Sequence, residues 1–242
     1  MRGIALGIVV AVIGIAVAIA IYKRREGFAE PPRILTSEET ARFLLEDSDG
    51  YIAGLSAVDL YARKSRTSAE YAQKAAAAAC DLSAYAQKIN AAVRLAGHGV
   101  PPGVKIAGTS GRFYEDGLPH TRRDIIFITP EIASGSLERL SETLVHESVH
   151  LYQRENPKEI AEWLRRAGYS RVGARTDYPL ARANPDLDGW IYADAKGKVY
   201  IAEYNSERPS SIRDVQLSDP AFEHPFENMA YFIAAGSKQL GE

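Results

Sequence analysis

The sequence His146-Glu-Ser-Val-His150 is an H-E-x-x-H pattern, and it lies in a stretch whose apolar residues recur at helical spacing. Residues four apart lie on one face of an α-helix, so His146 and His150 can direct two imidazoles at one metal ion. Glu147 lies about 100° further around the axis, where its carboxylate can reach a metal-bound water without binding the metal. Zinc lowers the pKa of such a water toward about 7, and a nearby carboxylate can then accept its proton. The pattern therefore predicts a helix that carries a catalytic zinc site, with Glu147 as general base.

The residues that flank this motif predict a helix of about 137–155. Ser136 is a suitable N-cap residue, and Pro157 marks the end of the segment. The chain of 242 residues contains only five histidines, and two of them belong to the motif. The alternative is a surface helix on which His146, Glu147 and His150 are only solvated polar residues.

A second constraint is the segment from Gly3 to Tyr22, which contains no charged residue. It is long enough to cross the hydrocarbon core of a bilayer as a helix. Three basic residues, 23–25, follow it directly in place of a small-residue cleavage site, so the sequence predicts an uncleaved transmembrane anchor. These residues outnumber the basic residues before the segment, which favours a cytosolic C-terminal domain. We thus expect a single-pass membrane protein that contacts the membrane through residues 3–22, a segment that also offers a route to a homo-oligomer.

The overall composition is that of a globular chain. The net charge is −2 and 46% of the residues are hydrophobic, which excludes a disordered chain and argues against a nucleic-acid partner. The single cysteine, Cys80, excludes an intrachain disulfide.

The pattern of apolar residues and breakers divides the chain into four parts. Residues 1–25 are the anchor with its basic flank, 26–36 a linker with paired prolines, 37–98 a helical region, and 99–242 a domain that mixes strands and helices. The individual elements expected are helices at about 37–45, 53–64 and 68–95, strands at 104–107 and 124–129, the motif helix, a helix from Pro157 to Gly168, a hairpin formed by 190–194 and 198–204, and a helix from Pro225 to Ala235.

A catalytic zinc ion usually has three protein ligands, so a third ligand must come from outside the motif. The best candidate is Glu227, which lies in the first turn of the last expected helix, with the small Ala230 on the same face. Acidic residues also stabilise first turns without any metal, so helix capping is the competing interpretation. His224 and Glu223 remain open as alternative ligands, and Asp186 and Glu207 are more distant ones.

The polar cluster before the strand at 124–129 supplies candidates for substrate binding. His120 and Arg122 could stabilise an oxyanion or bind a substrate carboxylate, although a polar loop with incidental charges is an equal alternative. Tyrosine hydroxyls could also donate to an oxyanion, and the sequence does not choose among Tyr178, Tyr192, Tyr204 and Tyr231.

Taken together, these residues resemble the zincin metallopeptidases, and among them the gluzincin-like group, which pairs H-E-x-x-H with a glutamate on a second helix. The phrases GLPHTRRDIIFIT, TLVHESVHLYQR, NPDLDGWIY and EHPFENMAYFIA are also similar, more loosely, to an uncharacterised zincin-like group of large DNA viruses. The resemblance covers about 104–236. It implies a zincin-like α+β metallopeptidase domain at 99–242, with zinc between the motif helix and the helix of Glu227.

The leading expectation is therefore a membrane-anchored zinc metallopeptidase that hydrolyses protein or peptide substrates. In this scheme His146, His150 and Glu227 bind zinc, and Glu147 activates water. The alternative is a membrane-anchored structural or assembly protein, for example in a virion membrane, which uses the domain as a scaffold.

Overall fold

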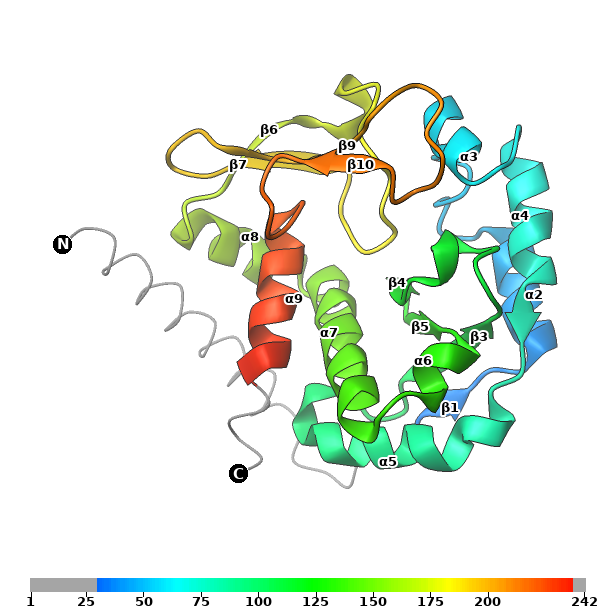
Figure 1. Ribbon diagram of the computed structural model, residues 1–242. Coiled ribbons are helices and arrows are strands. Elements are labelled where there is room, and N and C mark those ends of the chain that lie inside the picture. Colours follow the sequence, from blue (N-terminus) through cyan, green and yellow to red (C-terminus); the bar gives the residue numbers. More distant parts are fainter. Residues whose placement is uncertain (1–29, 237–242) are drawn as a thin grey trace.

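The computed structural model describes residues 30–236 as an α+β fold built around a small mixed sheet (Figure 1). Strands β1, β3, β5 and β4 follow one another across this sheet. The β1–β3 and β3–β5 pairs are parallel, while β4 pairs antiparallel with β5 and so forms an edge. The short strand β2 pairs with the far end of β3. The bounds of these strands are β1 Arg33–Ile34, β2 Ala79–Cys80, β3 Lys105–Thr109, β4 His120–Arg122 and β5 Ile125–Ile128.

Helices cover both faces of this sheet because its central strands are apolar on both sides. Ile126 and Ile128 of β5 pack against α5 and α7, whereas Phe127, between them, packs on the opposite face against α2 and α4. The alternation follows from the two-residue period of a strand. The helices are α2 Ser37–Glu46, α3 Ala57–Ala62, α4 Ser68–Ala77, α5 Ala86–Ala96, α6 Pro130–Ser134, α7 Leu137–Glu155, α8 Pro157–Arg166 and α9 Pro225–Gly236.

Two smaller sheets lie above the ends of α7 and α9 in the view of Figure 1. Strands β6, β7 and β8 form one sheet, and β9 and β10 form the other. Tyr192 of β7 and Phe226 of α9 belong to one hydrophobic cluster with α7 and α8, which joins the upper strands to the helices. The strand bounds are β6 Ser170–Ala174, β7 Trp190–Ala193, β8 Val199–Tyr200, β9 Ala202–Tyr204 and β10 Val215–Leu217.

The structure confirms several expected elements. The motif helix α7 covers the expected residues, and α2, α8 and α9 begin where their capping signals predict. Strands β3 and β5 fall within or beside the expected ranges. In the hairpin, β7 pairs with β8, but the continuation at β9 turns away to pair with β10.

Other expectations were wrong in identifiable ways. The single helix expected at 68–95 is divided into α4 and α5, because residues 79–80 add strand β2 to β3 and Asp81 accepts hydrogen bonds from the Ser83 backbone and hydroxyl. Gly108 permits this close pairing, since a Cβ there would lie 2.5 Å from the Cys80 carbonyl oxygen. The helix expected at 53–64 is shortened to α3. The expected linker contains β1, and β4, β6 and β10 are short strands that were not predicted.

The predicted transmembrane helix at residues 3–22 lies outside the described part of the chain. Within residues 30–236, no helix combines the length and the apolar character needed to cross a bilayer. This finding contradicts the predicted fold class and the single-pass localisation as far as both included a membrane span. The description is corrected to an α+β fold.

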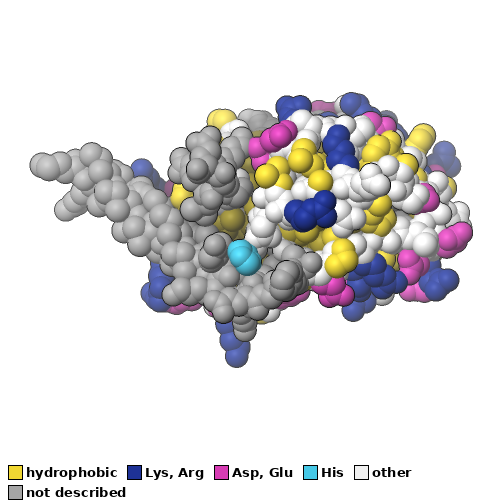
Figure 2. All heavy atoms as spheres, turned by 90° about the horizontal axis from the view of Figure 1, so that it is seen from below, with side chains coloured by type: hydrophobic (Ala, Val, Ile, Leu, Met, Phe, Trp, Pro, Cys, Tyr) yellow, Lys and Arg dark blue, Asp and Glu magenta, His cyan; other side chains and the backbone are white. Residues whose placement is uncertain are grey.

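One face of the molecule is shown from below in Figure 2. On its described part, hydrophobic, basic and acidic side chains are interspersed and are not gathered by type. This face thus presents a mixed surface.

Candidate metal centre

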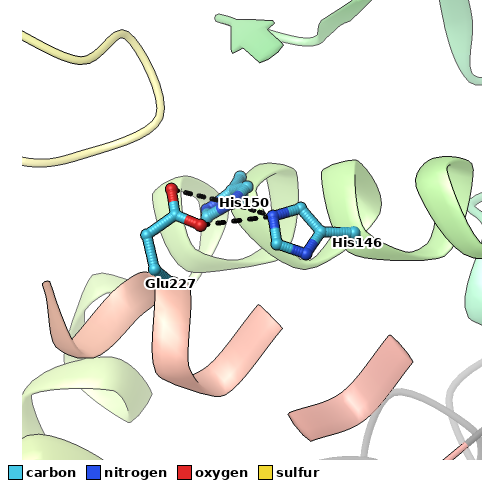
Figure 3. A group of neighbouring side chains, drawn as sticks. All are labelled: His146, His150 and Glu227. Atoms are coloured by element: carbon cyan, nitrogen blue, oxygen red, sulfur yellow. Dashed lines mark hydrogen bonds and ion pairs between the residues drawn. The ribbon is translucent and has the colours of Figure 1, made fainter. Parts of the chain in front are cut away.

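Helix α7 places the two motif histidines side by side. The Ser136 side chain caps the helix by accepting from the Arg139 amide, and the helix continues without interruption to Glu155. His146 and His150 lie one turn apart, and their Nε2 atoms are 3.2 Å from each other. Both imidazoles are therefore directed at the same point beside the helix (Figure 3).

Helix α9 brings a carboxylate to that point from the other end of the sequence. Glu227 Oε2 lies 3.3 Å from His146 Nε2, and Oε1 lies 3.7 Å from His150 Nε2. Ala230, one turn further along α9, is fully buried in the cluster that joins α9 to α7, and its small side chain permits the close approach. His146, His150 and Glu227 together form a group that could hold a metal ion.

The charge states of this group suit a cation. Burial acts to raise the pKa of Glu227, but the adjacent His150 and His146 outweigh it and bring the pKa to about 2, so the carboxylate is ionised. Burial lowers the pKa of His150 against the opposing influence of Asp186 and Glu227. The neutral imidazole, which is the metal-binding form, is thereby favoured.

A hydrogen bond behind the site fixes the orientation of His150. Its Nδ1 lies 2.9 Å from the Gln153 side-chain oxygen, an acceptor, so Nδ1 carries the proton and the Nε2 lone pair faces the site. Gln153 Nε2 donates to the Phe226 carbonyl at 3.1 Å and thus links α7 to α9. The sequence analysis missed Gln153. Its position one turn beyond the second histidine is the signal that could have identified it.

Glu147 is almost completely buried beside the group, and its Oε2 atom has no hydrogen-bond partner within the described residues. Burial raises the pKa of Glu147 well above its ordinary value, and the nearby Asp186 and Glu227 raise it further. Glu147 thus places a buried carboxyl group at the cavity, where it can exchange a proton with a bound molecule.

The site opens into a cavity of about 770 Å³. Among residues 30–236, those that line it lie at or after Glu115, so the helical region 37–98 contributes none of this lining. The side chains with acid–base or metal-binding chemistry in the lining are Glu115, His120, Glu131, Glu142, His146, Glu147, Asp186, Glu223 and Glu227.

The two alternative third ligands are engaged elsewhere. His224 Nδ1 accepts from the Phe226 amide at 3.1 Å, and its Nε2 lies 3.4 Å from Asp188 Oδ1. Glu223 accepts from Arg182 at 2.6 Å and from Asn184 at 2.7 Å. Glu227 is therefore the acidic residue of α9 that meets the histidine pair.

A second group that could hold an ion consists of Glu147, His150 and Asp186. Both groups include His150, whose Nδ1 is occupied by Gln153, so they are alternative donor sets around one imidazole. In the second set, Asp186 Oδ1 already accepts two hydrogen bonds from Thr121. This engagement of Asp186 favours the set with Glu227.

The two candidates for substrate binding are placed differently. His120 lines the cavity and donates from Nδ1 to the Leu118 carbonyl at 2.9 Å, while its buried Nε2 has no partner among the described residues. Arg122 is buried behind the strand, where it binds Asp47 and donates to the Tyr114 hydroxyl. The Arg122 side chain therefore stabilises the fold through these contacts and does not line the cavity.

Among the candidate tyrosines, Tyr231 is the one next to the histidines. Its ring centroid lies 4.6 Å from that of His146, and the residue lines the cavity. The hydroxyl of Tyr192 donates to Asp188, and the hydroxyl of Tyr204 donates to Asp59. Only Tyr231 of the four is therefore both in the cavity lining and in contact with the metal-binding group.

Comparison of the chain with protein-family models, with curated proteins and with solved structures gives no match. The arrangement of residues in the cavity is thus the basis on which a function can be assigned.

Proposed function

We propose that this protein is a zinc-dependent hydrolase that cleaves peptide bonds, in the manner of the zincin metallopeptidases that its motif residues resemble. The observation that carries the proposal is the convergence of His146, His150 and Glu227 beside the buried carboxyl of Glu147, at a cavity that His146, Glu147 and Glu227 line. Two imidazoles and one carboxylate form a donor set typical of catalytic zinc sites.

The residues of the chain have separate tasks in this proposal. His146, His150 and Glu227 would hold zinc, which supplies Lewis acidity and lowers the pKa of water. Glu147 takes a proton from the attacking water and returns it to the leaving amine. A purely structural site would have no use for that carboxyl group, which is why Glu147 favours a catalytic function over a scaffold.

The test is the zinc content of the full chain after loading with zinc and removal of the excess. We expect one zinc per chain in the wild-type protein and none in His146→Ala or Glu227→Ala, because each variant loses one of three ligands. Glu223→Ala is the matched control, since Glu223 precedes the same helix but binds Arg182 and Asn184. It should retain zinc.

A wild-type protein that binds no zinc would contradict the proposal and favour a scaffold. Zinc that survives Glu227→Ala but is lost in Glu223→Ala would move the third ligand to Glu223.

Replacement of Gln153 by leucine should weaken zinc binding without removing a ligand. The change deletes the acceptor that holds His150 Nδ1, and loss of such a partner typically costs about 10- to 100-fold in metal affinity. Competition with a chromophoric chelator measures the affinity. The control is Glu155→Leu at the end of the same helix, which should leave the affinity unchanged. Arg154→Leu is unsuitable as a control because Arg154 binds β4. Equal affinities of Gln153→Leu and wild type would show that His150 needs no such support.

A further inference from the structure

Strand β4 borders the cavity and is the edge of the main sheet. Along an antiparallel pair, successive residues point their backbone groups alternately toward the partner strand and away from it. Thr121 is the middle residue of β4, and its N–H and C=O bind side chains outside the sheet. Thr121 is therefore the residue of β4 that would have to pair with an added strand.

Both outward backbone groups of Thr121 are already occupied. Its N–H donates to Asp186 Oδ1 at 2.6 Å, and its carbonyl accepts from Arg154 at 3.0 Å. The Thr121 hydroxyl also bonds both side chains, at 2.7 Å to Asp186 and 2.6 Å to Arg154. Asp186 and Arg154 thus bind this point of the strand from two sides.

The positions on either side of β4 offer no substitute. Pro119, two residues before Thr121, has no N–H to donate. Arg123, two residues after it, has a left-handed backbone with φ of 50°, and its carbonyl accepts from Arg154 at 3.4 Å. An extended peptide needs a row of unpaired N–H and C=O groups in order to add to a sheet edge.

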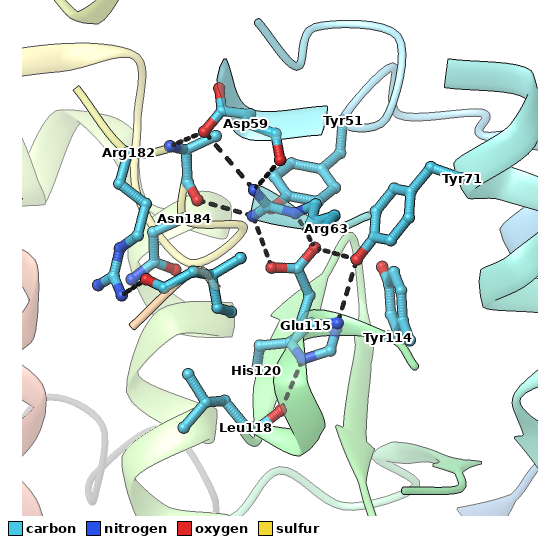
Figure 4. Close-up of polar contacts among 12 residues, drawn as sticks. Tyr51, Asp59, Arg63, Tyr71, Tyr114, Glu115, Leu118, His120, Arg182 and Asn184 are labelled. Carbon is cyan, nitrogen blue, oxygen red and sulfur yellow. Dashed lines mark hydrogen bonds and ion pairs between the residues drawn. The ribbon is translucent and has the colours of Figure 1, made fainter. Parts of the chain in front are cut away.

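The segment that carries Asp186 is itself held firmly. The Ala183 amide donates to Asp59 at 2.8 Å, its carbonyl accepts from Arg63 at 3.0 Å, and the Pro185 carbonyl accepts from Arg154 at 2.6 Å (Figure 4 shows the Asp59–Arg63 cluster). Opening the edge would break these bonds in a buried setting, where each lost partner is costly. The closed edge is therefore a stable part of the fold.

We propose that Asp186 and Arg154 determine substrate specificity by closing the edge of β4, so that the cavity binds short peptides in preference to internal segments of extended chains. This inference rests on the proposed peptidase function. A volume of about 770 Å³ lies within the range of pockets that enclose small ligands. A short peptide can be held there by the metal centre and by side chains, without a backbone ladder along β4.

The first arm of the test is amide hydrogen exchange in the full chain, which needs no activity. In wild type, the Thr121 amide should exchange slowly. In Asp186→Ala it should exchange about tenfold faster or more, because its acceptor is gone, while the amides of β5 stay slow. The control is Asp188→Ala, which removes an acidic residue of the same segment that accepts from the Trp190 amide and the Tyr192 hydroxyl, both outside β4.

The second arm compares the affinity of two labelled peptides for the zinc-loaded Glu147→Gln protein. One is a blocked tetrapeptide, and the other is a blocked 12-residue peptide that contains the same four residues at its centre. We expect the tetrapeptide to bind about tenfold tighter or more, and we expect Asp186→Ala in this background to reduce the difference. Asp186→Asn keeps an oxygen acceptor for the Thr121 amide, so it is the matched control and should preserve the difference. Where the alanine variant fails to fold, slow exchange of the Thr121 amide and the preference for the tetrapeptide in the protein with Asp186 still test the inference.

Two results would overturn the inference. One is a Thr121 amide that exchanges as fast in wild type as in Asp186→Ala. The other is a 12-residue peptide that binds the zinc-loaded Glu147→Gln protein, with Asp186 intact, as tightly as the tetrapeptide or more tightly. A protein that binds no zinc would contradict the proposed function instead, and the exchange measurement would still decide whether the edge is closed.

Discussion

Replacement of Glu147 by glutamine is expected to reduce kcat for peptide hydrolysis by about a thousandfold, within the range of roughly 10² to 10⁴ for loss of a general acid–base group. The amide is nearly isosteric with the carboxyl group but can neither take a proton from water nor return it. Glu147 belongs to α7 but not to the group of His146, His150 and Glu227. Zinc content should therefore remain that of wild type.

Glu138→Gln provides the matched control for this experiment. This variant makes the same substitution in the first turn of the same helix. The Glu138 side chain is exposed and does not line the cavity. It should keep wild-type kcat. A Glu147→Gln protein that hydrolyses peptide at the wild-type rate, with zinc bound, would rule out the proposed mechanism.

Replacement of Arg63 by methionine is expected to lower the free energy of unfolding by about 3 to 5 kcal/mol, as is usual when one partner of a buried ion pair is removed. Arg63 is buried among acceptors from four parts of the chain, and it binds Glu115 through two hydrogen bonds of 2.9 and 2.7 Å (Figure 4). Burial acts to raise the pKa of Glu115, but Arg63 outweighs it and holds the pKa below its ordinary value. Without Arg63, a buried carboxylate would be left without its cation.

Urea unfolding measures this effect, and two further variants make the result specific. Arg165→Met is the matched control, because Arg165 forms an exposed pair with Glu162 on α8 and should leave the free energy of unfolding unchanged. The double variant Arg63→Met/Glu115→Gln should recover part of the loss, since it removes both charges. A single variant as stable as wild type would show that the cluster of Figure 4 does not hold the fold together.

The local elements around the motif could be predicted from the sequence because their signals are local. The Ser136 cap and the apolar period of 137–155 define α7 to the residue, and the i, i+4 spacing places His146 and His150 on one face. Glu227 could be ranked first because it lies in the first turn of the last expected helix, with the small Ala230 on the same face, but nothing in the sequence excluded Glu223 or His224. The contacts of Arg182, Asn184 and Asp188 with those two residues made that distinction.

The short strands could not be predicted because they are stabilised by partners that are distant in the sequence. Strand β1 has only two residues and exists by pairing with β3, and β2 interrupts an Ala-rich segment of high helix propensity for the same reason. Similarly, β4 consists of three polar or charged residues, a composition typical of a loop, and Asp186 and Arg154 bind it from distant parts of the chain.

The sequence by itself determined the motif helix, the two histidines that face one point and the carboxyl next to them, since these depend on helical geometry and on capping within a few residues. The tertiary structure alone decided that Glu227 completes the group that could hold a metal ion and that the edge of β4 is closed. These contacts join residues from separate elements that lie more than sixty positions apart. Their geometry depends on how α7, α9 and the main sheet pack, and no local pattern encodes that packing.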